Sequence, residues 1–151
     1  MTGEAVRKAG EIFDVDGTLC DVRGVRHLID GKGGFDAFHR ASAGCPPHAH
    51  VVEAARQAQA EGRAVLVVTG RVEKWRRLTS MWLALHEVPS DGLWMRRDGD
   101  FRKDFLVKRE ILRRLRGRYD IVRAWDDNPA VLRLWEREGI PTTVVPGWDG
   151  S

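Results

Sequence analysis

Two aspartates stand two residues apart at the end of an apolar stretch, in the string Ile12-Phe13-Asp14-Val15-Asp16-Gly17-Thr18-Leu19. Side chains alternate along an extended strand and Gly17 lets the backbone bend, so Asp14 and Asp16 are expected to converge on one polar site. Crowded carboxylates repel each other unless a divalent cation or a shared proton offsets their charge, and oxygen ligands suit Mg²⁺. The string therefore predicts a Mg²⁺-binding carboxylate site, against the alternative of a solvated turn with a capping aspartate.

A second polar group follows the apolar run at residues 64–68, which has the composition of a buried parallel strand. There Thr69, Gly70 and Arg71 place a hydroxyl, a flexible backbone and a guanidinium at the carboxyl end of the strand. This combination suits phosphate oxygens. Taken alone, Thr69 could equally be an ordinary helix cap.

Two later segments complete the set. Lys108 lies in a helical pattern, and Asp126 and Asp127 follow an apolar strand at residues 121–125. Singly, Lys108 could be a solvated helix lysine, and the aspartates could cap the helix that begins at Asn128-Pro129. The order of the groups makes the set specific: carboxylates, then a threonine, then a lysine, then paired carboxylates.

These motifs resemble those of the haloacid dehalogenase superfamily of phosphotransferases, over residues 12 to about 145. The resemblance implies that Asp14 is the nucleophile and Asp16 the general acid and base. It implies that Thr69 binds the phosphoryl group and that Lys108 neutralises charge between nucleophile and phosphate. The Mg²⁺ ligand set that it implies consists of Asp14, Asp16, Asp126 and Asp127.

A narrower resemblance comes from residues 94–104, 107–111 and 126–135, which are similar to the 3′-phosphatase domain of phage-type polynucleotide kinase-phosphatases. That family removes 3′-phosphates from nucleic-acid ends. The resemblance implies substrate binding by five residues: Arg26, Gly70, Arg71, Arg97 and Arg102. No Gly-x-x-x-x-Gly-Lys-Ser/Thr phosphate loop is present, so the chain is expected to be a stand-alone phosphatase or one domain of a larger protein, acting with a kinase or a ligase.

Length and composition predict one globular domain over residues 1–151, with 42% hydrophobic and 31% charged residues. No apolar run approaches the roughly 18 residues of a membrane-spanning helix. Cys20 and Cys45 have no metal-ligand spacing, which favours free thiols in a reducing cytoplasm.

The predicted fold class is α/β: a three-layer sandwich with a central parallel sheet, Rossmann-like, of haloacid dehalogenase type. Strands are expected at residues 11–15, 64–68, 92–95, 121–125 and 142–145. Helices are expected at residues 35–41, 48–60, 72–85, 105–115 and 129–137. The interval between the first two strands leaves room only for a minimal cap, a flap within about residues 20–45.

The leading functional hypothesis is a Mg²⁺-dependent phosphomonoesterase that acts on 3′-phosphorylated ends of DNA or RNA, or on a nucleotide. The alternatives are a small-molecule phosphatase or nucleotidase, and a non-catalytic module that binds nucleic-acid ends. Trp75, Trp94 and Trp148 are candidates for stacking on bases, although a core position is the more usual role of tryptophan. The sequence leaves the oligomeric state open.

Overall fold

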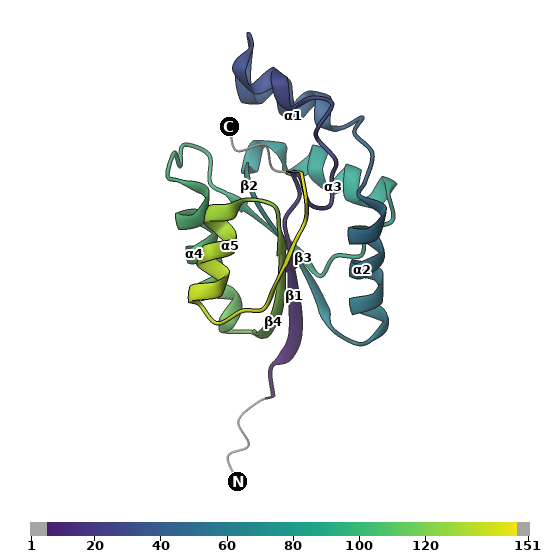
Figure 1. Ribbon diagram of the computed structural model, residues 1–151, viewed down its shortest axis with the longest axis vertical. Helices are drawn as coiled ribbons and strands as arrows, with labels where there is room; N and C mark the ends of the chain where they lie inside the picture. The colour runs from purple at the N-terminus through teal and green to yellow at the C-terminus, as the bar shows by residue number, and fades with distance from the viewer. Residues whose placement is uncertain (1–5, 148–151) are drawn as a thin grey trace.

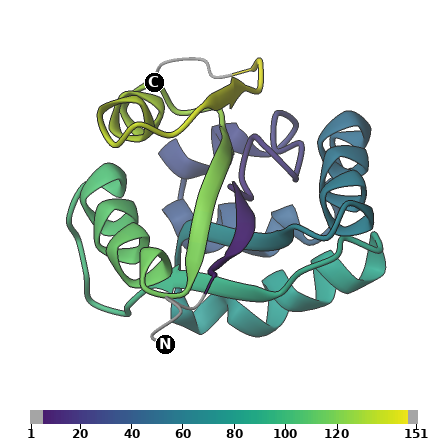
Figure 2. The same cartoon turned by 90° about the horizontal axis from the view of Figure 1, so that it is seen from below.

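The computed structural model describes residues 6–147 and contains a five-stranded parallel sheet between two layers of helices (Figures 1 and 2). The strand order is β3-β2-β1-β4-β5, so the first strand lies in the centre. The strands are β1 (Lys8–Phe13), β2 (Ala64–Val72), β3 (Gly92–Arg96), β4 (Tyr119–Asp126) and β5 (Thr142–Val144). The helices are η1 (Arg26–Asp30), α1 (Gly34–Ser42), α2 (Ala49–Ala60), η2 (Glu73–Trp75), α3 (Arg76–Leu85), α4 (Asp104–Arg116) and α5 (Pro129–Arg137), of which η1 and η2 are 3₁₀ helices.

Side chains along each buried strand point alternately to the two faces of the sheet, so the core has two halves, one on each face. Ile12 and Leu66 face α4 and α5, whereas Phe13 and Val67 face α2 and α3. Figure 1 shows the two pairs of helices on opposite sides of the sheet. Both faces of the central strands are therefore covered, as expected for parallel strands with continuous apolar runs. The predicted α/β three-layer architecture is confirmed.

The element boundaries differ from the sequence prediction at several strand ends. β2 continues to Val72 because Val72 pairs with Arg96 of β3, so Thr69, Gly70 and Arg71 lie inside the strand. The helix expected from residue 72 begins only at Arg76, after the 3₁₀ turn η2. At the first strand the shift is opposite: β1 ends at Phe13, which leaves the two aspartates in the following loop.

The remaining boundary shifts are smaller. β4 begins at Tyr119 because β1 pairs with it from Lys8 onward, and β5 ends one residue before the predicted position. Trp148, a predicted stacking candidate, lies outside the described residues.

The cap occupies only part of the interval of about residues 20–45 within which it was expected. Leu19, Cys20 and Val22 are fully buried in the core, so the beginning of the 20–45 segment belongs to the main domain. What remains is η1 and α1, which lie beyond the carboxyl ends of the strands, at the top of Figure 1. No helix within residues 6–147 has the length and apolar character needed to cross a membrane.

Candidate active site

The carboxyl ends of the central strands bring together the polar side chains that the sequence singled out. Lys108 of α4 is buried between two of these strand ends: its Nζ lies 2.9 Å from Asp14 Oδ1 and 2.9 Å from Asp126 Oδ2. Burial alone would lower the pKa of Lys108, but the attraction of Asp104, Asp126 and Asp14 outweighs it and raises the pKa. Lys108 is therefore a fixed positive charge beside Asp14.

Three carboxylates form an acidic cluster around this lysine. Asp14, Asp126 and Asp127 are buried, and each offers an oxygen within 4.8 Å of those of the other two. Burial and the neighbouring carboxylates raise the pKa of Asp14 well above its usual range and that of Asp127 to about 7. Among the described residues, no donor forms a hydrogen bond with the buried Asp127 Oδ2. Three buried oxygens with an excess of negative charge fit a divalent cation.

The loop after β1 holds Asp14 in place and allows Asp127 to approach. Gly17 has φ of +82°, and a Cβ atom there would lie 1.9 Å from Asp127 Oδ2. Thr18 Oγ1 donates a hydrogen bond to Asp14 Oδ2 at 3.2 Å, and the Thr18 carbonyl lies 2.8 Å from His48 Nδ1. Glycine is required at this turn because both its backbone conformation and the space beside it exclude a side chain.

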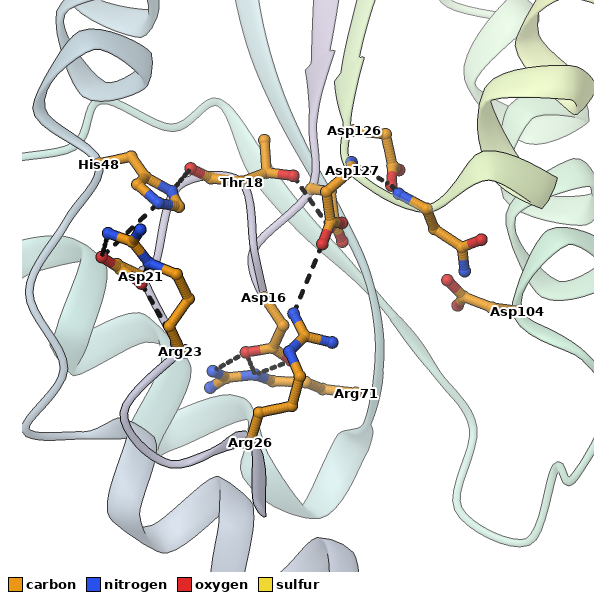
Figure 3. A network of polar contacts seen from close by, with 12 residues as sticks. Asp16, Thr18, Asp21, Arg23, Arg26, His48, Arg71, Asp104, Asp126 and Asp127 are labelled. Atoms are coloured by element: carbon orange, nitrogen blue, oxygen red, sulfur yellow. Dashed lines mark hydrogen bonds and ion pairs between the residues drawn. The ribbon is translucent and has the colours of Figure 1, made fainter. Parts of the chain in front are cut away.

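Asp16 does not join the acidic cluster, contrary to the expectation that both aspartates converge. Figure 3 shows Asp16 turned toward Arg71 and away from Asp126 and Asp127. Arg71 donates hydrogen bonds to both oxygens of Asp16, from Nε at 3.2 and 3.0 Å and from Nη2 at 2.5 Å. Burial would raise the pKa of Asp16, but Arg71 outweighs it and lowers the pKa. The geometry therefore gives Asp16 a guanidinium partner and no place beside the other carboxylates.

Arg71 is itself almost completely buried, and its remaining hydrogen bonds reach other elements. It donates to Thr79 Oγ1 of α3 and to Ser42 Oγ of α1, both at 3.0 Å. The predicted substrate-binding residue Arg71 thus also links β2 to the cap. Its neighbour Thr69 is buried at the cavity floor, where its hydroxyl accepts a hydrogen bond from the Arg71 amide.

The other predicted substrate-binding residues differ in whether they line the cavity. Arg26 of η1 and Gly70 line the cavity, and Arg26 Nη2 lies 3.5 Å from Asp127 Oδ2. Figure 3 marks this ion pair with a dashed line. Arg102 also lines the cavity, but it is half exposed and pairs with Asp100 and Glu110. Arg97 is exposed and is not among the residues that line the cavity.

Sequence reasoning missed two residues of the site, Arg96 and Asp104. Arg96 donates to the Gly70 carbonyl at 2.8 Å, and its Nη2 lies 3.7 Å from Asp104 Oδ1. Asp104 directly precedes the helix expected at residues 105–115, and its Oδ2 lies 3.5 Å from Lys108 Nζ. The spacing of four residues between Asp104 and Lys108 on one helix was the available signal.

A cavity of about 760 Å³ opens above the acidic cluster. Its floor includes Asp14, Thr69 and Asp127, and its walls come from the cap and from the loop between β3 and α4. The Asp14 carboxylate is therefore at the bottom of the cavity, beside the fixed positive charge of Lys108.

Comparison with known proteins identifies the family of this chain. The family model of the polynucleotide kinase PNKP phosphatase domain, a haloacid dehalogenase type, matches residues 8–147. The chain belongs to this family. The predicted superfamily and the narrower resemblance are both confirmed, and so is phosphatase as the class of enzyme.

Comparisons with individual proteins agree with this family assignment. One relative is a protein of Autographa californica nuclear polyhedrosis virus whose name describes a bifunctional polynucleotide kinase/RNA ligase. The two sequences are 28% identical over 127 residues, and the match covers 82% of this chain and 18% of the viral protein. A chain in the structure of the Pnkp1/Rnl/Hen1 RNA repair complex matches 99% of this chain with a TM-score of 0.82 and 26% identity, and this chain spans 46% of it. The class C acid phosphatase from Bacillus anthracis shares the fold, with a TM-score of 0.69 at 16% identity over 93% of this chain and 66% of that one.

Proposed function

We propose that this domain removes 3′-phosphates from nucleic-acid ends in a Mg²⁺-dependent reaction with an aspartyl-phosphate intermediate. The observation that carries the proposal is the position of Asp14: its carboxylate lies at the cavity floor, hydrogen-bonded to Lys108 and next to Asp126 and Asp127.

Asp14 is the nucleophile in this proposal. Lys108 and Thr18 each donate a hydrogen bond to one of its two oxygens, which fixes the orientation of the carboxylate. Attack on phosphorus forms the acyl phosphate and breaks the bond to the 3′ oxygen of the nucleic acid. Water then attacks phosphorus, which releases phosphate and regenerates the carboxylate. Lys108 offsets negative charge on the transferring group throughout.

Asp16 handles the protons of both steps. The leaving 3′ oxygen needs a proton, and the attacking water must later lose one. Arg71 keeps Asp16 ionised, which suits the second step. Donation in the first step requires Asp16 to gain a proton when the phosphate of a substrate competes for Arg71.

The acidic cluster would hold the metal through Asp14, Asp126 and Asp127. When bound, Mg²⁺ supplies positive charge that polarises the phosphoryl oxygens. Asp16 was predicted as a fourth ligand; its carboxylate pairs with Arg71, so its side chain is left out of the ligand set proposed here.

Membership of the PNKP phosphatase family supports nucleic acid as the substrate class, and the small cap leaves the cavity open to a long substrate. Arg26, Arg71 and Arg102, all at the cavity, are proposed to contact its phosphates. Arg97 remains a weaker candidate because it lies outside the cavity lining. Since the relatives are named as a kinase/ligase and as part of a repair complex, cooperation with a kinase or a ligase is part of the proposal.

The test compares phosphate release from four substrates at equal Mg²⁺: an oligonucleotide with a 3′-phosphate, the same oligonucleotide with a 5′-phosphate, a 3′-mononucleotide and glycerol phosphate. The highest kcat/KM is expected for the 3′-phosphorylated oligonucleotide, and chelation of the metal should abolish release. Equal kcat/KM for glycerol phosphate or the mononucleotide would favour the small-molecule phosphatase. Absence of turnover on all four would leave a non-catalytic binding module.

A further inference from the structure

The outer cavity carries aromatic side chains that folding does not explain. Phe35 of α1 and Phe101 of the loop between β3 and α4 both line it, yet they are 62% and 95% exposed. An exposed phenylalanine contributes little to the stability of a domain, because its ring stays in contact with water. Both rings belong to segments beyond the same end of the sheet, above the carboxyl ends of the strands in Figure 1.

Phe35 belongs to a continuous aromatic surface on the cap side. Its ring is stacked on His39 with centroids 6.1 Å apart, and His39 lies 5.7 Å from the ring of Trp75. His39 is buried, and Lys74 lies over the Trp75 ring at 5.3 Å. Phe35 is therefore the most exposed ring of this wall, with His39 and Trp75 behind it.

The charged side chains of the same region are engaged with one another. Lys74 Nζ lies 2.8 Å from Asp36 Oδ1, and Arg102 Nη2 lies 2.8 Å from Asp100 Oδ2. Both pairs line the outer cavity. Because these charges are compensated locally, the aromatic faces are the groups in this part of the cavity that suit an uncharged base.

We propose that Phe35 and Phe101 bind the base of the 3′-terminal nucleotide while Asp14 acts on its phosphate. This inference rests on the proposed function and adds a subsite to it. The two rings and Asp14 line one cavity, so a nucleotide placed with its phosphate at the floor has its base in the outer part. Stacking on phenylalanine accepts any base, because every base has an aromatic face. The subsite is therefore specific for a base-bearing end but not for its sequence.

The experiment compares two oligonucleotides of the same sequence, each with a 3′-phosphate. One ends in a normal nucleotide, and the other ends in a tetrahydrofuran residue that lacks the base. For Phe101→Ala and Phe35→Ala, kcat/KM on the normal end should fall by about tenfold or more, whereas kcat/KM on the abasic end should change less than twofold. Phe101→Trp should retain the wild-type preference for the normal end.

Met81→Ala is the matched control, because Met81 of α3 is as exposed as Phe35 and does not line the cavity. This variant should have the kcat/KM of the wild type on both oligonucleotides. The inference is overturned if the wild type has the same kcat/KM on both oligonucleotides, or if the phenylalanine variants match the kcat/KM of the wild type on the normal end. It is also overturned if the variants lose kcat/KM by the same factor on both ends. Failure of the wild type to cleave either oligonucleotide would instead contradict the proposed function.

Discussion

Asp14 and Asp16 are close in sequence, but their carboxylates meet opposite electrostatic environments. Burial and the neighbouring Asp126 raise the pKa of Asp14, which Lys108 only partly offsets. Arg71 lowers the pKa of Asp16 despite its burial. Carboxylates whose environments shift their pKa values apart can take different roles in one reaction. For the proposed roles, Asp14 must be ionised when it attacks, which Lys108 and a cation bound by the acidic cluster would favour, and Asp16 must gain a proton before it can donate one.

The burial of His39 predicts how the stability of the domain depends on pH. Burial in the cap lowers its pKa to about 4, below the usual 6.5. Between these values the unfolded chain binds a proton that the folded domain does not, so stability falls as pH decreases from about 6.5 toward 4. Between pH 7 and pH 5, the free energy of unfolding of the wild type should fall by about 2 kcal/mol more than that of His39→Gln. Urea denaturation at each pH measures this difference. An equal loss in both proteins would show that His39 is not buried in its neutral form.

The residues that could be predicted from the sequence are those that follow apolar strands. Asp14, Thr69 and Asp126 each follow an apolar run in the sequence, and the carboxyl ends of parallel strands share one edge of a sheet, so the pattern indicates that they lie close together. The pairing of Asp16 with Arg71 spans 55 residues and depends on side-chain direction after the Gly17 turn. Arg96 was missed because its hydrogen bonds go to backbone carbonyls, which no sequence pattern reveals, and its ion pairs with Asp100 and Asp104 depend on the path of the loop between them.

At the scale of elements, the turn after β1 and the end of β2 determine the site. β1 ends at Phe13, the Asp14 amide donates a hydrogen bond to the Trp125 carbonyl of β4, and the tight turn at Gly17 leaves room for Asp127. β2 extends four residues beyond its predicted end at residue 68 because it pairs with β3, and this pairing holds Arg71 under the cap. Such boundaries depend on the neighbouring strand, so the hydrophobic pattern of β2 alone could not predict them.

Gly17→Ala tests the importance of this turn. The new Cβ would strain the backbone at positive φ and would collide with Asp127, so Mg²⁺ affinity and turnover should each fall at least tenfold. The change is measured by metal titration and by phosphate release. Gly24→Ala is the control, because no atom lies within 4 Å of its added Cβ, and it should behave as wild type. Wild-type metal affinity in Gly17→Ala would contradict the close approach of Asp127 to the turn.

At the scale of the whole molecule, the acidic cluster lies at the carboxyl edge of the sheet that separates the two halves of the core. Asp14 follows the central strand β1, Asp126 ends the adjacent β4, and Asp127 follows it. Repulsion among these buried carboxylates costs folding free energy in the absence of a cation. A cation that binds the folded state alone should therefore stabilise the entire domain.

Thermal unfolding should reveal this linkage. Mg²⁺ at 100 times its Kd should stabilise the wild type by about 2.7 kcal/mol and raise Tm by several degrees. Asp127→Asn removes a buried charge, so without metal it should be at least as stable as the wild type, while its Tm should respond little to Mg²⁺. A large Mg²⁺ shift in Asp127→Asn would exclude Asp127 as a ligand.

The most direct test of covalent catalysis is to trap the intermediate. The protein is mixed with excess oligonucleotide whose 3′-phosphate is radiolabelled, in the presence of Mg²⁺, and the reaction is quenched in acid during turnover. The mechanism predicts label on the protein as an acyl phosphate at Asp14, located by mass spectrometry, and its absence from Asp14→Asn. Turnover by the wild type without any labelled protein, or label at a different residue, would contradict it.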